Sequence, residues 1–171
     1  MNDLLETFGG NPRAECRAIF ASLFVLQNSL QSAGEKIEEE LTMKQWLLLA
    51  ITSICPPPRT FTNIGAIMGC SRQNVKKLAA ALESRGYLTI EDGAGNSVQL
   101  SLTDKAEQYG QTMQIRHATT LQLLFEDFDE QQIDDLFASI MKLYRGVERV
   151  EAYASRLPQG NRGGIRSWDS P

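Results

Sequence analysis

Apolar residues recur at helical spacing along most of this 171-residue chain, in stretches separated by capping residues, prolines and glycines. The first stretch starts at Asn11, a suitable N-cap with Pro12 at the first helical position, and its apolar stripe continues to about Glu40. At about 1.5 Å per residue such a helix spans roughly 40 Å, which is longer than a small globular domain needs. We therefore expect part of it to pack against a second subunit.

A mostly apolar helix is predicted next. Thr42 and Gln45 have the spacing of a capping box, and residues 46–54 are almost wholly apolar. Prolines 56–58 end this helix, because proline cannot donate to the helical hydrogen-bond ladder. A helix with so few polar positions is expected to be buried.

Residues 60–87 predict two short helices joined by a tight turn at residues 69–71. Thr62 is expected to cap the first, and its expected inward-facing residues are Ile64, Ile67 and Met68. Ser71 is expected to cap the second, whose apolar face consists of Val75, Leu78, Ala79 and Leu82. The opposite face carries Gln73, Lys77, Ala80 and Ser84. This pattern is typical of a helix-turn-helix, although the second helix alone also fits an ordinary amphipathic surface helix.

The remainder of the chain predicts a hairpin and two further helices. Strands at residues 87–90 and 98–102 flank a turn-forming segment, and Thr103 is expected to cap a helix that runs to about residue 125. Asp129 and Gln132 form a second capping box, which opens the last helix. Its apolar positions step by four and three, as in helices that pair along their length with another subunit or within one: Ile133, Phe137, Ile140, Tyr144 and Val147.

The charge distribution permits contact with nucleic acid without requiring it. The formal net charge is −4, but residues 59–105 hold six Lys or Arg against four Asp or Glu, which leaves +2 there and −6 elsewhere. A local basic patch suffices for phosphate contacts, since charges are screened within about 10 Å at moderate salt.

Composition and motifs argue against a membrane protein, a metal site or an enzyme. No apolar run reaches the length of a membrane span and residues 1–10 lack a signal-peptide pattern, so we expect a cytoplasmic protein. The three cysteines lack metal-ligand spacing, and there is no phosphate-binding glycine loop. His117 is the only histidine, and we interpret it as a packing or surface residue. No cofactor is predicted.

The order of these elements and the local sequence resemble the MarR family of winged helix-turn-helix transcription regulators. The resemblance covers roughly residues 11–153 and rests on LTMKQWLLLA at 41–50, IGAIMGCSRQNVKKLAAALESRGYL at 64–88 and VQLSLTDKA at 98–106. It implies a mainly α fold with a small β-hairpin wing. The implied regions are a first dimerisation helix at 11–40, a DNA-binding lobe at 41–103, C-terminal dimerisation helices at 104–155 and a flexible tail at 156–171.

The resemblance implies a homodimer that presents two recognition helices to successive major grooves of a double-stranded DNA operator. Gln73 and Asn74 can pair bidentately with adenine, while Arg72 can contact guanine or phosphate. The candidate DNA-contacting residues are Thr62, Asn63, Ser71, Arg72, Gln73, Asn74, Lys76, Lys77 and, in the hairpin, Asn96.

The predicted wing departs from the family pattern. Family wings carry an arginine that enters the minor groove, whereas this hairpin has no Arg or Lys between Tyr87 and Ser101 and contains Glu91 and Asp92. Carboxylates near phosphates oppose binding. Either the wing contacts only the DNA backbone, through Asn96 and Ser97, or the protein binds DNA with relaxed sequence specificity.

Small aromatic or phenolic effectors bind in the family between the DNA-binding lobe and the dimer helices. The candidates to line such a cleft here are Phe20, Phe24, Trp46 and Tyr109, each of which also fits ordinary core. A repressor released by a small molecule is therefore the leading interpretation.

Two alternatives stay open. Cys16, flanked by Arg13 and Arg17, resembles the peroxide-sensing cysteine of one branch of the family, but the partner tyrosines expected on the second helix are absent. The acidic wing and the overall charge also fit a protein-interaction module that keeps the fold and has lost operator binding.

Overall fold

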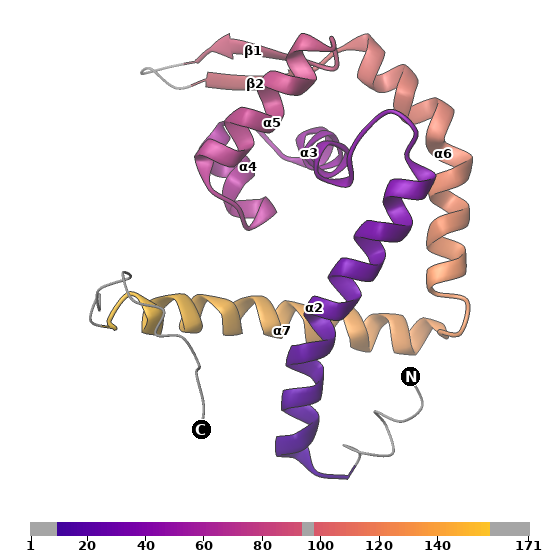
Figure 1. The fold of residues 1–171 in the computed structure, drawn as a ribbon, viewed down its shortest axis with the longest axis vertical. Helices are drawn as coiled ribbons and strands as arrows, with labels where there is room; N and C mark the ends of the chain where they lie inside the picture. Colours follow the sequence, from indigo (N-terminus) through magenta and orange to yellow (C-terminus); the bar gives the residue numbers. More distant parts are fainter. Residues whose placement is uncertain (1–9, 94–97, 158–171) are drawn as a thin grey trace, which may run out of the picture. The chain divides into compact units, whose positions relative to one another are not determined.

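Helices precede and follow one hairpin along the residues that the computed structural model describes, 10–93 and 98–157 (Figure 1). The chain divides into two compact units, Met1–Ala118 and Thr119–Pro171. The elements are α2 (Pro12–Ile37), α3 (Met43–Ile54), α4 (Phe61–Met68), α5 (Arg72–Ser84), β1 (Leu88–Asp92), β2 (Val98–Leu102), α6 (Asp104–Leu124) and α7 (Glu130–Ala154). The predicted mainly α fold with a small antiparallel hairpin is confirmed.

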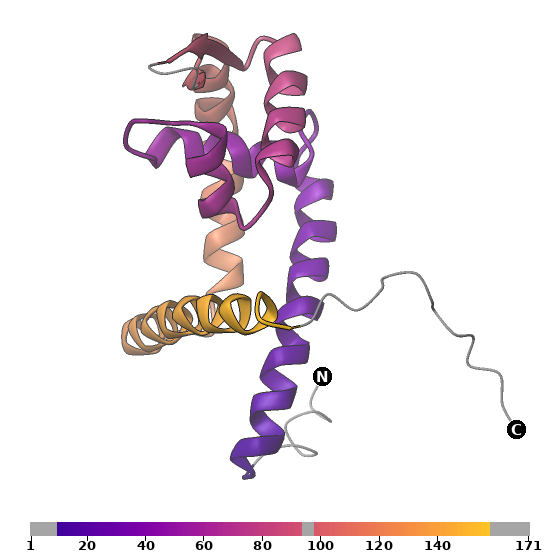
Figure 2. The ribbon, with the colours of Figure 1, turned by 90° about the vertical axis from the view of Figure 1, so that its left-hand side faces the viewer.

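The long first helix begins as predicted but ends earlier. Asn11 caps α2 by accepting hydrogen bonds from the amides of Arg13 and Ala14, and the helix extends well beyond the other elements of its unit (Figures 1 and 2). The prediction that α2 continues to about Glu40 is wrong, because Glu38 already has an extended backbone. That conformation turns the Glu38 carboxylate toward α6 instead of continuing the helix.

Helix α3 lies at the centre of a lobe formed by α3, α4, α5 and the hairpin (Figure 1). The capping box of Thr42 and Gln45 is confirmed, and α3 contacts α4, α5 and β2. Thr52 is fully buried with its hydroxyl donating to the Leu48 carbonyl at 2.7 Å, so burial leaves no unpaired polar group there. The fully buried side chains around α3 are Leu48, Ile64, Val75, Ala79, Leu82 and Leu100.

The turn between α4 and α5 depends on two glycines. Gly69 has a φ of 62°, and the amide of Cys70 donates to the Gly65 carbonyl at 2.9 Å, which closes the end of α4. A Cβ on Gly65 would lie 2.8 Å from the Cys70 carbonyl oxygen. Only glycine therefore lets the chain after the turn approach α4 so closely.

Two predictions about α4 are wrong. Thr60, not Thr62, is the N-cap, because its hydroxyl accepts the Asn63 amide while Phe61 at the first helical position is buried in the core. Ile67 is 52% exposed although it was expected to point inward. The buried face is set by Phe61, Ile64 and Gly65, and at about 100° per residue Ile67 lies more than a quarter turn from the centre of that face.

The hairpin is attached to the rest of the lobe at its base. Helix α5 ends at Ser84, and Gly86, with a φ of 77°, lies in the turn that follows. Strand β1 starts at Leu88, one residue later than predicted, and Leu88 pairs with Leu102. The Leu100 amide donates to the Arg59 carbonyl at 3.0 Å, which joins β2 to the segment between α3 and α4. Asn96 lies outside the described residues.

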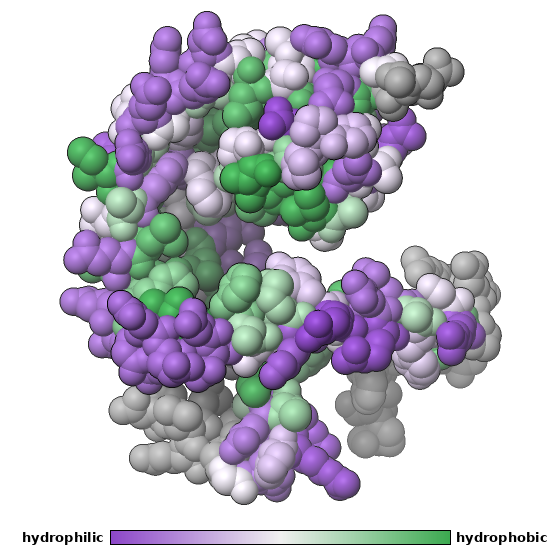
Figure 3. Space-filling model, turned by 180° about the vertical axis from the view of Figure 1, so that it is seen from behind, coloured by the Kyte–Doolittle hydropathy of each residue, from purple (hydrophilic) through white to green (hydrophobic). Residues whose placement is uncertain are grey.

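Helices α6 and α7 start at the predicted caps. Thr103 accepts the Ala106 amide, and the capping box of Asp129 and Gln132 is present. In the single chain, each predicted apolar side chain of α7 is more than a third exposed. Seven large apolar side chains of α2 are exposed to a similar degree. Figure 3 colours hydrophobic residues at the surface green. No helix in the described residues is long and apolar enough to cross a membrane.

We predict that Gly65→Ala destabilises the protein by about 1–3 kcal/mol, because the added methyl group meets a backbone carbonyl that cannot move without opening the turn. Gly110→Ala is the control: Gly110 lies in α6 with nothing within 4 Å of its Cβ position. That change should raise the unfolding midpoint in urea slightly, since alanine favours helix by about 0.5–1 kcal/mol. Equal effects of both changes would contradict the close approach at Gly65.

Candidate nucleic-acid interface

Helix α5 is fixed by one buried face and presents the other to solvent. Val75, Ala79 and Leu82 are fully buried, and Ser71 caps the helix by accepting the Asn74 amide at 3.3 Å. The predicted cap and the predicted apolar and free faces are therefore confirmed. The direction in which the free face points is set by the core of the lobe.

Hydrogen-bond donors gather in the first two turns of α5. No acidic residue lies in the first turn, and Glu83 near the other end accepts the Ile90 amide at 3.0 Å. The exposed residues are Ser71, Arg72, Gln73, Asn74, Lys76 and Lys77. An exposed helix N-terminus with basic and amide side chains around it has the chemistry to contact phosphates and base edges.

Thr62 and Asn63 are exposed in the first turn of α4. The Asn63 side-chain amide donates to the Pro58 carbonyl at 2.8 Å, so one of its two hydrogens is used within the fold. The hydroxyl of Thr62 and the second hydrogen of Asn63 are the groups left for an external phosphate.

The described part of the hairpin is acidic. Glu91 and Asp92 are both exposed, and the whole segment between Tyr87 and Ser101 contains no Lys or Arg. These carboxylates repel a DNA backbone, and the hairpin has no Lys or Arg to offset them.

A groove of about 740 Å³ lies between α3, the base of the hairpin and α6. Trp46 and Tyr109, two of the predicted effector-contacting residues, both line it together with Arg59, Glu107 and His117. Phe20 and Phe24 do not line it: they lie exposed on α2, where their ring centroids are 5.2 Å apart. The structure therefore brings together only two of the four predicted residues.

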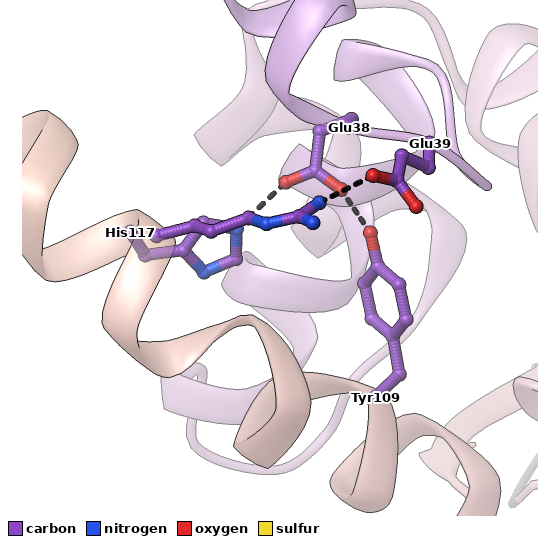
Figure 4. A network of polar contacts seen from close by, with 5 residues as sticks. Glu38, Glu39, Tyr109 and His117 are labelled. Carbon is purple, nitrogen blue, oxygen red and sulfur yellow. Dashed lines mark hydrogen bonds and ion pairs between the residues drawn. The ribbon is translucent and has the colours of Figure 1, made fainter.

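Three consecutive glutamates connect the end of α2 to the rest of the first unit, and Figure 4 shows the contacts of the first two. Glu38 accepts hydrogen bonds from the Tyr109 hydroxyl and from His117 Nε2, the latter at 2.6 Å. Glu39 pairs with Arg116 at 2.7 Å, and Glu40 accepts from the Tyr87 hydroxyl. The glutamates thus hold the α2–α3 connection against α6 and against the start of the hairpin.

Solved structures match this chain, whereas no protein-family model and no curated protein matches its sequence. A MarR/EmrR family transcriptional regulator from Acinetobacter sp. ADP1 has a TM-score of 0.70 at 20% identity, over 78% of this chain and 96% of that one. MepR of S. aureus, solved as a DNA complex, has a TM-score of 0.62 at 16% identity, over 75% and 96%. The fold is the winged helix-turn-helix of MarR regulators.

A third MarR-type match concerns a ligand-bound protein. The PcaV transcriptional regulator from Streptomyces coelicolor, solved with its natural ligand, has a TM-score of 0.58 at 20% identity, over 82% of this chain and 96% of that one. The matched proteins are regulators of transcription rather than enzymes.

The sequence does not single out Arg59 or Glu38, and it indicates His117 only as a packing or surface residue. Arg59 lines the groove while its Nε donates to the Cys55 carbonyl at 2.8 Å. A run of three glutamates between a helix end and a capping box was the available signal for Glu38, but nothing local indicated its partners on α6.

The cysteines of the MarR-type fold lie in three different environments. Cys16 is exposed on α2, Cys55 is buried in the lobe and Cys70 is partly buried in the turn before α5. Exposure leaves Cys16 accessible to an oxidant, and redox sensing through it stays a prediction. No cluster of three His, Cys, Asp or Glu suitable for a metal occurs among the described residues.

Burial raises the pKa of Tyr109 well above its usual value, and the hydrogen bond to Glu38 and its charge raise it further. Above about pH 10 the unfolded chain loses this proton while the folded chain keeps it, so the free energy of unfolding falls as pH rises. We predict that Tyr109→Phe lowers stability at pH 8 and makes its decline between pH 8 and 11 shallower than in the wild type. Urea unfolding at several pH values measures the free energy of unfolding of both proteins. The same decline with pH in the variant and the wild type would contradict the raised pKa of Tyr109.

Proposed function

We propose that the protein is a homodimeric, sequence-specific DNA-binding transcriptional regulator, most simply a cytoplasmic repressor that a small molecule releases. The main support for this proposal is helix α5, whose buried face fixes the direction of an exposed face rich in hydrogen-bond donors. The MarR-type fold supports the proposal, since one match is a DNA complex and another is bound to a ligand.

Within this proposal, Gln73 and Asn74 read bases in the major groove while Arg72, Lys76 and Lys77 contact phosphates. Thr62 and Asn63 supply further backbone contacts from α4, with Asn96 in the hairpin as a candidate backbone contact outside the described residues. Because Glu91 and Asp92 oppose close approach of the hairpin, α5 supplies most of the specificity.

Dimerisation is supported by the apolar side chains that the single chain leaves exposed on two helices. Those of α2 are Ile19, Phe20, Leu23, Phe24, Val25, Leu26 and Leu30. Contiguous exposed apolar surface of this kind marks interaction sites in soluble proteins. We propose that α2 and the C-terminal helices pair with a second copy, and that the winged lobe contacts the operator.

The groove is the proposed effector site. It combines the aromatic rings of Trp46 and Tyr109 with Arg59 and His117, which suits a small aromatic molecule that carries an acceptor group. Such a ligand regulates only if it binds the DNA-binding and the released states with different affinity.

A salt titration of binding to the promoter DNA beside the protein's own gene tests the proposed function. Gln73→Ala should cost about 1–3 kcal/mol at preferred sequences and relax sequence preference, because it removes a base contact. Lys77→Ala should weaken binding to all sequences, because it removes a phosphate contact. It should also make the slope of the logarithm of the binding constant against the logarithm of the salt concentration shallower by about one. Lys44→Ala, an exposed lysine on α3, is the control. Salt-independent or absent binding would refute the proposal.

The dimer prediction is tested on α7. Phe137 is 64% exposed in the single chain, and we predict that Phe137→Glu weakens the dimer about tenfold or more by placing a charge in an apolar interface. Gln131→Glu adds the same charge at an exposed polar position of the same helix and should leave the dimer intact. Sedimentation over a concentration series measures both, and equal dimer affinities for the two variants would contradict the proposed interface.

A further inference from the structure

Glu38 is a buried carboxylate whose two oxygens are both taken by side chains of α6. Its side chain is 3% exposed; Oε2 accepts from the Tyr109 hydroxyl and Oε1 from His117 Nε2. Glu38 is also the residue that ends α2, and its amide donates to the Gly34 carbonyl at 2.8 Å. The end of the first helix is therefore held through these two donors.

The same two donors form part of the groove wall. Tyr109 and His117 lie eight residues apart on one face of α6, with Met113 buried between them. Trp46 packs edge-on against His117, with ring centroids 5.5 Å apart. A ligand that occupies the groove and accepts a hydrogen bond from either side chain competes directly with Glu38.

We propose that Glu38 couples the groove to α2: a groove ligand that hydrogen-bonds to Tyr109 or His117 frees Glu38 and loosens the end of α2. A buried carboxylate that loses its donors is unfavourable, so Glu38 turns toward water and the backbone at the end of α2 follows. This inference rests on the proposed function, because it supplies the regulatory step for the proposed effector site.

The neighbouring glutamates, Glu39 and Glu40, do not share their hydrogen-bond donors with the groove. Glu39 and Arg116 have side chains 71% and 51% exposed, and neither lines the groove. Water replaces such a contact at little cost. Glu40 accepts from Tyr87, which also does not line the groove. Glu39→Gln is therefore a matched control for Glu38→Gln, with the same substitution at the adjacent position.

A covalently attached probe tests the coupling without knowledge of the natural effector. Gln114 is an exposed, groove-lining residue three positions before His117, and Gln114→Cys is introduced together with Cys16→Ser and Cys70→Ser. Dithiobis(nitrobenzoate) then exchanges with the thiolate introduced on α6: the protein gains a thionitrobenzoate disulfide, the reagent's S–S bond breaks, and one coloured thionitrobenzoate leaves and is counted. The groove then holds an aromatic carboxylate at full occupancy.

Amide hydrogen exchange of residues 34–41, measured by mass spectrometry on the full-length dimer, is the readout. We expect the label to speed exchange about tenfold when Glu38 is present, also with Glu39→Gln. With Glu38→Gln, exchange should already be fast and the label should not change it. A label on Gln108→Cys, exposed on α6 outside the groove, should have no effect.

No change on labelling with Glu38 present, or the same change with Glu38→Gln, would overturn the coupling. If Glu38→Gln does not fold, Tyr109→Phe removes one of the two donors and should raise basal exchange while reducing the effect of the label. The unlabelled protein is assayed on DNA in parallel. Normal DNA binding together with no exchange response to the label rejects the coupling alone. Absent DNA binding rejects the proposed function, and the exchange response to the label still decides whether Glu38 couples the groove to α2.

Discussion

The burial of one face of α5 is the constraint on which the lobe depends. Val75, Ala79 and Leu82 have no exposed surface, and burial of a valine or leucine side chain contributes about 1.5–3 kcal/mol. Rotation of the helix by about half a turn would expose this face and bury Gln73 and Lys77 in its place. The orientation of the polar face is thus determined by packing with α3 and needs no contact with a ligand.

Most of the fold was predictable because its signals are local. Asn11, Thr42, Ser71 and Asp129 cap helices where the sequence indicates, since a capping side chain bonds to an amide two or three residues away. The error at Thr62 arose between two threonines that are both suitable caps, and burial of Phe61 decided for Thr60. Propensity alone cannot make that choice.

The residues of the candidate site likewise divide into those that local sequence patterns predict and those that only tertiary contacts reveal. The exposed face of α5 follows from periodicity, so its donor residues were predictable. The contacts of Glu38 join residues 71 and 79 positions apart, and no local pattern encodes a pairing over that separation. Phe20 and Phe24 were assigned to a cleft by residue type, but the groove is built by α3, α6 and the hairpin base. Only the tertiary arrangement distinguishes these rings from Trp46 and Tyr109.

The acidic hairpin has a consequence for how a regulator of this kind selects its sites. If Glu91 and Asp92 keep the hairpin from reading the minor groove, each subunit specifies only the few base pairs that one helix can reach. A genome offers many matches to so short a sequence. In the proposed dimer, selectivity then comes from the spacing between two half-sites, so the way the two subunits pair becomes part of sequence recognition.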